Sequence, residues 1–141
     1  MNSLEIENIL KEDKSFLGCY PLDQLPSFPS SFPKSLIINT ATSEHNGEHW
    51  VCLVLYKNRC YYFDSFGLPI FKRNILQFID KYKKVTYSDV CIQNTFSDYC
   101  GKFCIAFIKY VYSKSSYNQF LSRFDFVKLY KNDLIVEKIY K

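Results

Sequence analysis

Four residues of this sequence carry side chains that can perform nucleophilic catalysis, in the order His49, Asp64, Gln93 and Cys100. A thiol attacks a carbonyl carbon once an imidazole has accepted its proton, and a carboxylate that hydrogen-bonds the imidazole holds the ring in one tautomer. A side-chain amide can donate a hydrogen bond to the oxyanion that then forms. Together the four residue types indicate acyl transfer through a thioester.

Cys100 is expected in the first turn of a helix, because apolar residues recur behind it with the period of a helix. We expect Ser97 or Asp98 to cap this helix. Backbone N–H groups and the dipole at a helix start stabilise a thiolate. Gly101 costs ~1 kcal/mol within a helix but lacks a Cβ, so we expect it to let a substrate backbone approach the sulfur. The periodic positions are Cys100, Phe103, Cys104, Phe107, Ile108 and Val111.

A β-hairpin is expected to bring His49 and Asp64 together. Segment 50–56 has the pattern of a strand covered on both faces, 57–58 offers a two-residue turn, and the aromatic segment 59–64 follows as the returning strand. The numbers of paired residues then sum to 115, which places Asp64 within one or two residues of His49. We expect the carboxylate to accept a hydrogen bond from the Nδ1–H group of the imidazole.

The remaining segments predict an α+β domain. We expect one domain, residues 1–141, in which a small mixed β-sheet packs against a central buried helix that carries Cys100, with further helices at its flanks. The other expected elements are a helix over 4–12 capped by Ser3, a proline-rich loop over 18–33, a strand over 36–38, a helix over 70–82, a strand over 85–92, and helices over 116–123 and 125–140.

Composition is that of a globular chain that folds alone. It has 141 residues with 48% hydrophobic content, and its six cysteines are expected to stay reduced. The longest apolar run, 50–56, is far shorter than the ~20 residues that span a bilayer. The N-terminus lacks an apolar signal segment. We therefore expect an intracellular monomer without a membrane partner.

Charge is distributed unevenly along the chain. Residues 1–71 contain five basic and eight acidic residues, whereas 72–141 contain thirteen and six, a net charge of about +7. A basic half can contact the phosphates of nucleic acid. A solvated lysine surface explains the same composition, so DNA is at most a secondary partner.

Short strings around the four residues resemble the adenovirus-type cysteine proteases, or adenains. The resemblance covers residues 36–108 and is absent from the first 17 and the last 25 residues. The wider clan of Ulp and SUMO proteases shares the His-Trp, Asp-Ser-x-Gly and Cys-Gly-x-Phe patterns, and Asn-Thr-Ala favours the adenain branch. The strings are Ile38-Asn39-Thr40-Ala41, Gly47-Glu48-His49-Trp50, Tyr62-Phe63-Asp64-Ser65-Phe66-Gly67, Gln93 and Cys100-Gly101-Lys102-Phe103-Cys104.

The resemblance implies a papain-related fold of the adenain and Ulp type and the activity of a thiol endopeptidase. Cys100 would be the nucleophile and His49 the general base, while Asp64 would orient the imidazole and Gln93 would bind the oxyanion. Two departures stand out. The adenovirus enzymes have Glu where this chain has Asp64, although Asp is usual in the wider clan, and they continue further beyond the cysteine.

The resemblance also implies what surrounds and uses the site. Trp50 would pack near the imidazole, and Gly101 would support the site or the bound substrate. Adenovirus proteases cut viral precursors at Gly-containing motifs during virion maturation and are stimulated by a peptide and by DNA. The implied partner is thus a polypeptide substrate, and the implied location is the host nucleus or cytoplasm, or the virion. A peptide or DNA activator is implied by family only, because the residues themselves require no cofactor.

Three other interpretations stay open. The same four residues would serve a deconjugase that cleaves ubiquitin-like modifiers at a diglycine. A non-catalytic module would keep the fold and bind a protein or DNA. His45, His49, Cys100 and Cys104 could form a zinc site, but their order and spacing are unlike those of a zinc finger, so we expect no metal.

Overall fold

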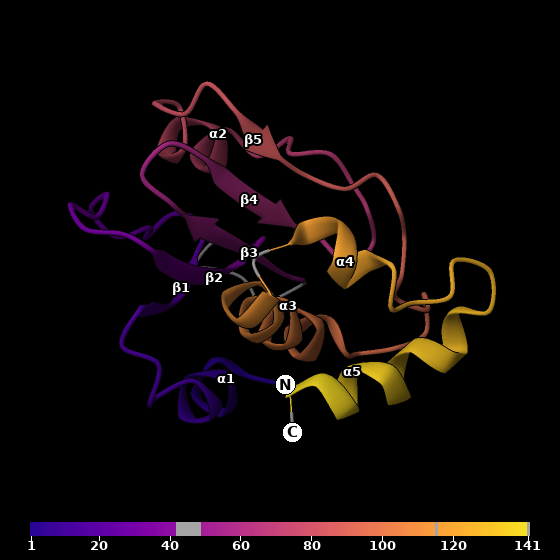
Figure 1. Cartoon of the computed structure of the whole chain (residues 1–141). Helices are drawn as coiled ribbons and strands as arrows, with labels where there is room; N and C mark the ends of the chain where they lie inside the picture. Colours follow the sequence, from indigo (N-terminus) through magenta and orange to yellow (C-terminus); the bar gives the residue numbers. More distant parts are fainter. Residues whose placement is uncertain (42–48, 115, 141) are drawn as a thin grey trace.

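The computed structural model describes residues 1–41, 49–114 and 116–140 and confirms the α+β class (Figure 1). None of its helices within these ranges is long and apolar enough to cross a membrane. The elements are α1 (Ser3–Ile9), β1 (Phe16–Pro21), β2 (Lys34–Asn39), β3 (Trp50–Leu55), β4 (Cys60–Phe63), α2 (Arg73–Phe78), β5 (Val85–Thr86), α3 (Cys100–Lys114), α4 (Tyr117–Leu121), the 3-10 helix η1 (Leu129–Lys131) and α5 (Asn132–Tyr140).

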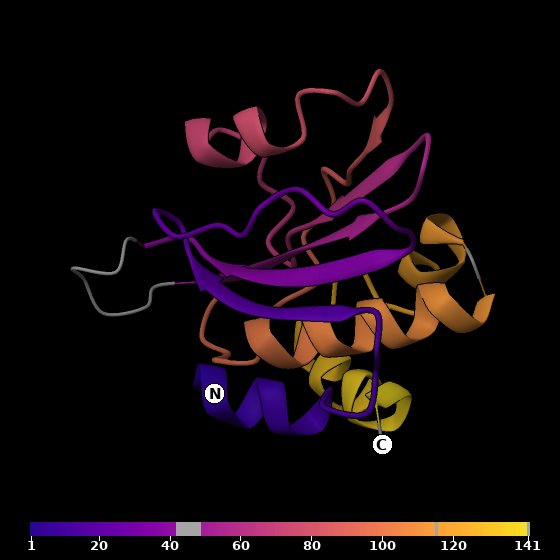
Figure 2. The same cartoon turned by 90° about the vertical axis from the view of Figure 1, so that its left-hand side faces the viewer.

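The strands form one mixed sheet in the order β1-β2-β3-β4-β5. The two edge pairs are parallel, and β3 pairs antiparallel with both of its neighbours. Helix α3 lies across one face against β3 and contacts α1, α4 and α5. Figure 2 shows α3 beneath the sheet with α1 and α5 below it, and α2 on the opposite side. The predicted buried helix is thus the centre of one of two layers that cover the sheet.

Strand β3 is buried on both faces, as its continuous apolar sequence predicts. Cys52 and Val54 pack into the cluster that contains α3, whereas Val51 and Leu53 pack into the cluster around Ile75 of α2. Successive side chains of a strand point to opposite faces, so a strand between two helical layers needs apolar residues at every position. This burial fixes the position of β3 in the sheet. The position of β3 in turn fixes the backbone of His49, which directly precedes it.

The hairpin has the predicted register. Cys52 faces Phe63 and Leu53 faces Tyr62, so paired numbers sum to 115. The N–H of Tyr56 donates to the carbonyl of Arg59 at 2.9 Å and closes the two-residue turn. The ends of β3 and β4 away from this turn therefore lie side by side.

The N-terminal half departs from prediction at two places. The first residues of the expected loop over 18–33 belong to the strand β1, which pairs with β2 through a register that shifts between Phe16 and Cys19. An edge strand tolerates such a bulge and a terminal proline such as Pro21 because one side needs no sheet partner. Helix α1 is capped by Asn2 rather than Ser3, with Glu5 completing a capping box.

Two later predictions overestimate their elements. The strand expected over 85–92 is the two-residue β5, and the helix expected over 70–82 is the shorter α2. Segment 88–93 instead runs beside the turn that follows β4, where the N–H groups of Ile92 and Gln93 donate to the carbonyl of Ser65 at 2.9 and 3.1 Å. The Ser65 carbonyl thus joins this segment to the turn after β4 without a ladder of strand hydrogen bonds.

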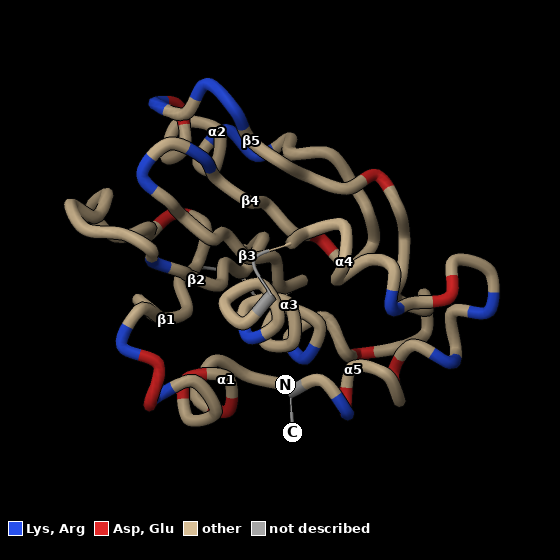
Figure 3. The backbone as a smooth tube through the Cα atoms, viewed as in Figure 1, with Lys and Arg blue, Asp and Glu red and all other residues tan. Residues whose placement is uncertain are grey.

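Basic side chains are spread over several sides of the part of the molecule that the structure describes. Figure 3 shows Lys and Arg on the loops around α2 and β5, on α3 and near α5, with Asp and Glu among them. This distribution is that of a solvated surface. DNA contact stays a prediction.

Gly67 is the position where the backbone most clearly requires glycine. Its φ is +70°, and a Cβ built there would lie 2.6 Å from the carbonyl carbon of Val90. We expect Gly67→Ala to lower the free energy of unfolding by about 2 to 4 kcal/mol, as measured by urea denaturation. The matched control is Gly101→Ala, whose Cβ would meet only side-chain atoms at 3.2 to 3.4 Å, with a change within about 1 kcal/mol. Equal effects of the two substitutions would contradict this account.

Candidate active site

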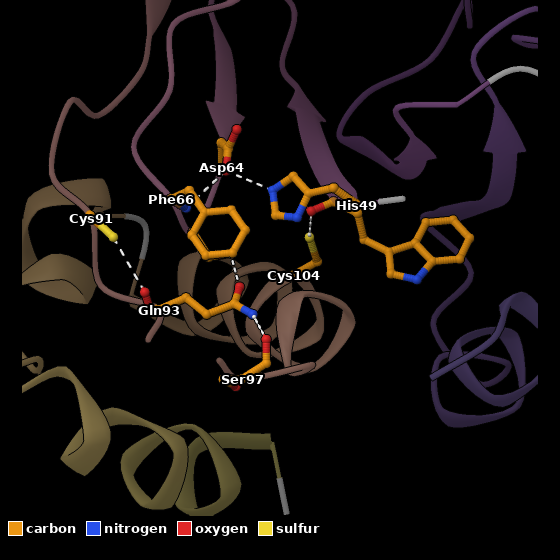
Figure 4. A network of polar contacts seen from close by, with 9 residues as sticks. His49, Asp64, Phe66, Cys91, Gln93, Ser97 and Cys104 are labelled. Atoms are coloured by element: carbon orange, nitrogen blue, oxygen red, sulfur yellow. Dashed lines mark hydrogen bonds and ion pairs between the residues drawn. The ribbon is translucent and has the colours of Figure 1, made fainter. Parts of the chain in front are cut away.

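His49 and Asp64 lie together at the open end of the hairpin. His49 immediately precedes β3, and its carbonyl accepts a hydrogen bond from the N–H of Thr40 at 2.9 Å. Asp64 directly follows β4. The His49 Nε2 atom is 2.8 Å from Asp64 Oδ1, with 13% and 4% of the two side chains exposed (Figure 4). The sequence-predicted proximity is therefore present as a direct, buried contact.

The nitrogen that contacts the carboxylate differs from the one expected. Asp64 accepts from Nε2, not from Nδ1. The same Oδ1 atom also accepts from the backbone N–H of Phe66 at 2.8 Å, which keeps the carboxylate in place. Because Nε2 is occupied, Nδ1 is the nitrogen left for exchange of a proton with Cys100. The expected roles of the two ring nitrogens are exchanged, and the expectation of Nδ1 was wrong.

Phe66 covers the imidazole, which the sequence did not indicate. Its ring stacks on that of His49 with centroids 4.7 Å apart and planes 25° apart. The turn that places it is closed by the N–H of Gly67, which donates to the carbonyl of Asp64 at 2.9 Å. The only signal in the sequence was that Phe66 occupies position x of the Asp-Ser-x-Gly string, and this pattern allows any residue type at x.

Cys100 is the first residue of α3. The first helical hydrogen bond runs from the N–H of Phe103 to the carbonyl of Tyr99 at 2.9 Å, so the helix begins later than either predicted cap. Ser97 binds the backbone just before the helix, because its hydroxyl accepts a hydrogen bond from the N–H of Tyr99 at 3.2 Å. The predicted place of Cys100 in the first turn is confirmed.

The electrostatics of the pair favour a proton on the imidazole. Burial lowers the pKa of His49, but hydrogen bonds and charges from Asp64 and Cys100 outweigh it and raise that pKa to about 9. Burial raises the pKa of the Cys100 thiol, yet hydrogen bonds with His49 and with the backbone at Trp50 and Gly101 bring it below its ordinary value. Both shifts are in the direction that favours a thiolate beside an imidazolium.

Gln93 is held from both ends of its side-chain amide. The Ser65 hydroxyl donates to Oε1, and Nε2 donates to the carbonyl of Ser97 at 2.8 Å (Figure 4). Because a carbonyl can only accept, the contact with Ser97 fixes which end of the amide is the nitrogen. One N–H group of that nitrogen donates to the carbonyl of Ser97, and its second N–H group can donate to another acceptor.

These side chains line one cavity of about 670 Å³. Cys100, His49 and Gln93 all contribute to its wall, as does Phe66. The structure thus brings the nucleophile, base and amide candidates to a single concave surface, with Asp64 behind the imidazole. The remaining lining residues are Met1, Asn2, Ser3, Asn39, Trp50, Thr95, Ser97 and Asp98.

Trp50 and Gly101 lie where the N-terminal segment meets the start of α3. A Cβ at Gly101 would lie 3.2 Å from Ile6, 3.3 Å from Trp50 and 3.4 Å from Met1. The missing side chain therefore lets the N-terminal segment and the indole pack against α3, and a role of Gly101 in substrate access stays a prediction. Trp50 Nε1 donates to the carbonyl of Met1 at 3.1 Å and completes this contact.

Among the described residues, no group of three His, Cys, Asp or Glu side chains is arranged to hold a metal ion. All six cysteines are free thiols. Cys104 is fully buried, and its Sγ atom lies 3.5 Å from the carbonyl of Trp50. His45 lies outside the described residues.

One comparison bears on the origin of this site. A protein named Protease from Human adenovirus B serotype 3 is 30% identical over 126 aligned residues. The match covers 72% of this chain and 60% of the relative. No protein-family model matches the chain. The similarity supports a distant relationship to an adenovirus protease.

The carboxylate of Asp64 should control the titration of His49. We expect Asp64→Asn to lower the His49 pKa by about 1 to 3 pH units, as measured by NMR of the ring nitrogens in a His45→Gln background that leaves one imidazole. Asp98→Asn, which removes a carboxylate from the wall of the same cavity, should leave that pKa unchanged.

The same titration has a consequence for stability. A folded-state pKa near 9 lies above the unfolded value of about 6.5, so the stabilisation is present below pH ~6.5 and is lost as pH rises through about 9. An Asp64→Asn protein with the wild-type His49 pKa would contradict the assignment.

Proposed function

We propose that this chain is a cysteine endopeptidase with Cys100 as the nucleophile and His49 as the general base. The observation that carries the proposal is the imidazole of His49, which is held by Asp64 at 2.8 Å on one nitrogen and lines the same cavity as Cys100. A thiol is activated when a base lies beside it and a third group orients that base. The distant relationship to an adenovirus protease supports protease activity.

The reaction begins when the Cys100 thiolate attacks a peptide carbonyl carbon and forms a C–S bond. The carbonyl oxygen becomes an oxyanion, which accepts hydrogen bonds from the second N–H of the Gln93 amide and from the backbone N–H of Cys100. The imidazolium of His49 then gives its proton to the departing amine as the C–N bond breaks. Asp64 stabilises the imidazolium before this step and keeps its ring in place.

The thioester is then hydrolysed by water, with His49 as the group that accepts the proton. His49, now neutral, takes a proton from water as the water oxygen attacks the thioester carbonyl. The oxyanion returns to the same donors, the C–S bond breaks, and the carboxylic acid leaves. The thiolate and imidazolium are restored without any group beyond those of the chain and one water molecule.

We infer the substrate class from the relative. A relative named Protease from an adenovirus supports polypeptides of a virus or a virus-like element as substrates. The resemblance of the sequence to the adenains implies cleavage of precursors at Gly-containing sites during particle maturation. The chain spans 60% of that relative's length.

Removal of the nucleophile should abolish cleavage without loss of the fold. Cys100→Ala should reduce peptide hydrolysis by at least about a thousandfold, measured with a fluorogenic peptide, with an unchanged melting temperature. Cys19→Ala is the matched control, because Cys19 is a half-buried thiol of β1 away from the cavity. Hydrolysis that persists in Cys100→Ala would refute the proposal.

Substrate preference separates the two enzymatic interpretations. We expect kcat/KM for Gly-containing precursor peptides to exceed that for diglycine-linked conjugates of ubiquitin-like modifiers by at least about tenfold, measured with equal concentrations of both and with Cys100→Ala as the blank. Cleavage of conjugates but not of peptides would instead identify a deconjugase.

A further inference from the structure

Three residues of α5, namely Asn132, Asp133 and Glu137, form hydrogen bonds with the segment that carries Gln93 and Cys100. Asn132 Nδ2 donates to the carbonyl of Ile92 at 2.8 Å. The Ser97 hydroxyl lies 3.0 and 3.2 Å from the two carboxylate oxygens of Asp133. Next along the helix, Glu137 Oε1 accepts from Tyr99 and Lys102 at 2.9 and 3.0 Å. One helix, α5 (Asn132–Tyr140), thus contacts this segment before, between and after the two site residues.

The middle contact leads directly to the amide of Gln93. Ser97 uses its hydroxyl for Asp133 and for the N–H of Tyr99, and its carbonyl for Gln93 Nε2. A residue held at its side chain presents its carbonyl in a fixed direction. Gln93 is 1% exposed, and its side-chain amide is held at its other end by Ser65, which is fully buried.

We propose that Ser97 and Asp133 are positioning residues for the oxyanion-binding amide of Gln93. Asp133 holds the Ser97 hydroxyl, Ser97 takes one amide N–H through its carbonyl, and the second N–H is thereby directed into the cavity that Cys100 lines. The term oxyanion-binding rests on the proposed function, whereas the positioning of the amide does not.

Preorganisation is the physical reason for such a chain of contacts. A donor stabilises a developing oxyanion in proportion to how little it must reorient when the charge forms. A glutamine side chain has three rotatable bonds, and burial by itself leaves its amide free to exchange O and N positions. Hydrogen bonds with Ser65 at one end and Ser97 at the other leave one orientation. Asp133 extends this constraint to a helix that the sequence resemblance does not reach.

The competing explanation is that α5 only packs beneath α3. Alkylation of Cys100 by iodoacetamide separates the two, because displacement of iodide forms no oxyanion and needs no amide donor. A positioning role therefore predicts a loss in peptide hydrolysis with no change in alkylation. A merely structural role predicts that both rates change together.

The direct test observes the amide itself. We would record the side-chain NH₂ signals of Gln93 in the ¹⁵N-labelled protein, assigned by their absence in Gln93→Met, and compare Ser97→Ala and Asp133→Ala with wild type. The two amide protons should be well separated in wild type and should shift toward each other and broaden in both variants. Asp133→Asn keeps an oxygen acceptor for Ser97 and should restore the wild-type signals. Leu134→Ala, at an exposed α5 position, is the matched control.

Kinetics supply the second readout. We expect Ser97→Ala and Asp133→Ala each to lower kcat about tenfold, with KM and the Cys100 alkylation rate unchanged. Neither should lower kcat further in a Gln93→Met background, since the amide through which they act is gone.

The outcomes separate the two proposals. Unchanged Gln93 amide signals in both alanine variants would overturn the positioning proposal, as would alkylation that falls in parallel with kcat. A wild-type protein without peptidase activity would instead refute the proposed function, while the amide spectra would still decide whether Ser97 and Asp133 position Gln93.

Discussion

The hydrogen bond between His49 and Asp64 depends on the register of β3 against β4. Side chains of a strand alternate between faces, so a shift by one residue would turn every β3 side chain to the opposite layer. Both layers are apolar and both faces of β3 are buried, which makes such a shift costly. The turn at Tyr56 and Arg59 adds a second constraint. The position of one imidazole is therefore a consequence of packing along the whole hairpin.

The nucleophile has a separate support that converges on the same place. Helix α3 is anchored by its buried face, where Phe107 stacks on Phe63 of β4 with ring centroids 4.6 Å apart. The helix start is thereby held at the end of the sheet where the hairpin is open. The polar site residues lie at the edge of the hydrophobic core, which is formed by other residues. A scaffold of this kind can keep a charged pair in a low-dielectric setting without itself depending on that pair.

The sequence predicts those features that depend on local periodicity. The helical repeat behind Cys100 placed α3, and the two apolar rows of 50–56 with a short turn placed the hairpin and its register. Edge strand β1 was missed because proline and glycine contradict strand propensity, while tertiary pairing with β2 overrides it. The ring nitrogen of His49 could not be predicted, because its choice depends on the side-chain rotation that the completed site imposes.

Contacts between segments far apart in the sequence could not be predicted for another reason. Ser97 and Asp133 are 36 residues apart, and neither residue type signals the other. Phe66 was likewise invisible, since a stacking partner needs only an aromatic ring in the correct turn. The residues of the site could be chosen from their chemistry, whereas the residues that hold them are defined by the fold.

The central claim is that Cys100 is a thiolate at a pH where an ordinary thiol is not. A brief, substoichiometric pulse of iodoacetamide near pH 6.5, where a thiol of pKa ~8.5 is only ~1% ionised, would test it, with all six cysteines mapped by mass spectrometry. Cys19 is the internal comparison, because burial and the charge of Glu7 raise its pKa to about 12. We expect label on Cys100 alone, and its loss in His49→Ala. Slow and equal labelling of Cys100 and the other accessible thiols, unaffected by His49→Ala, would contradict the account.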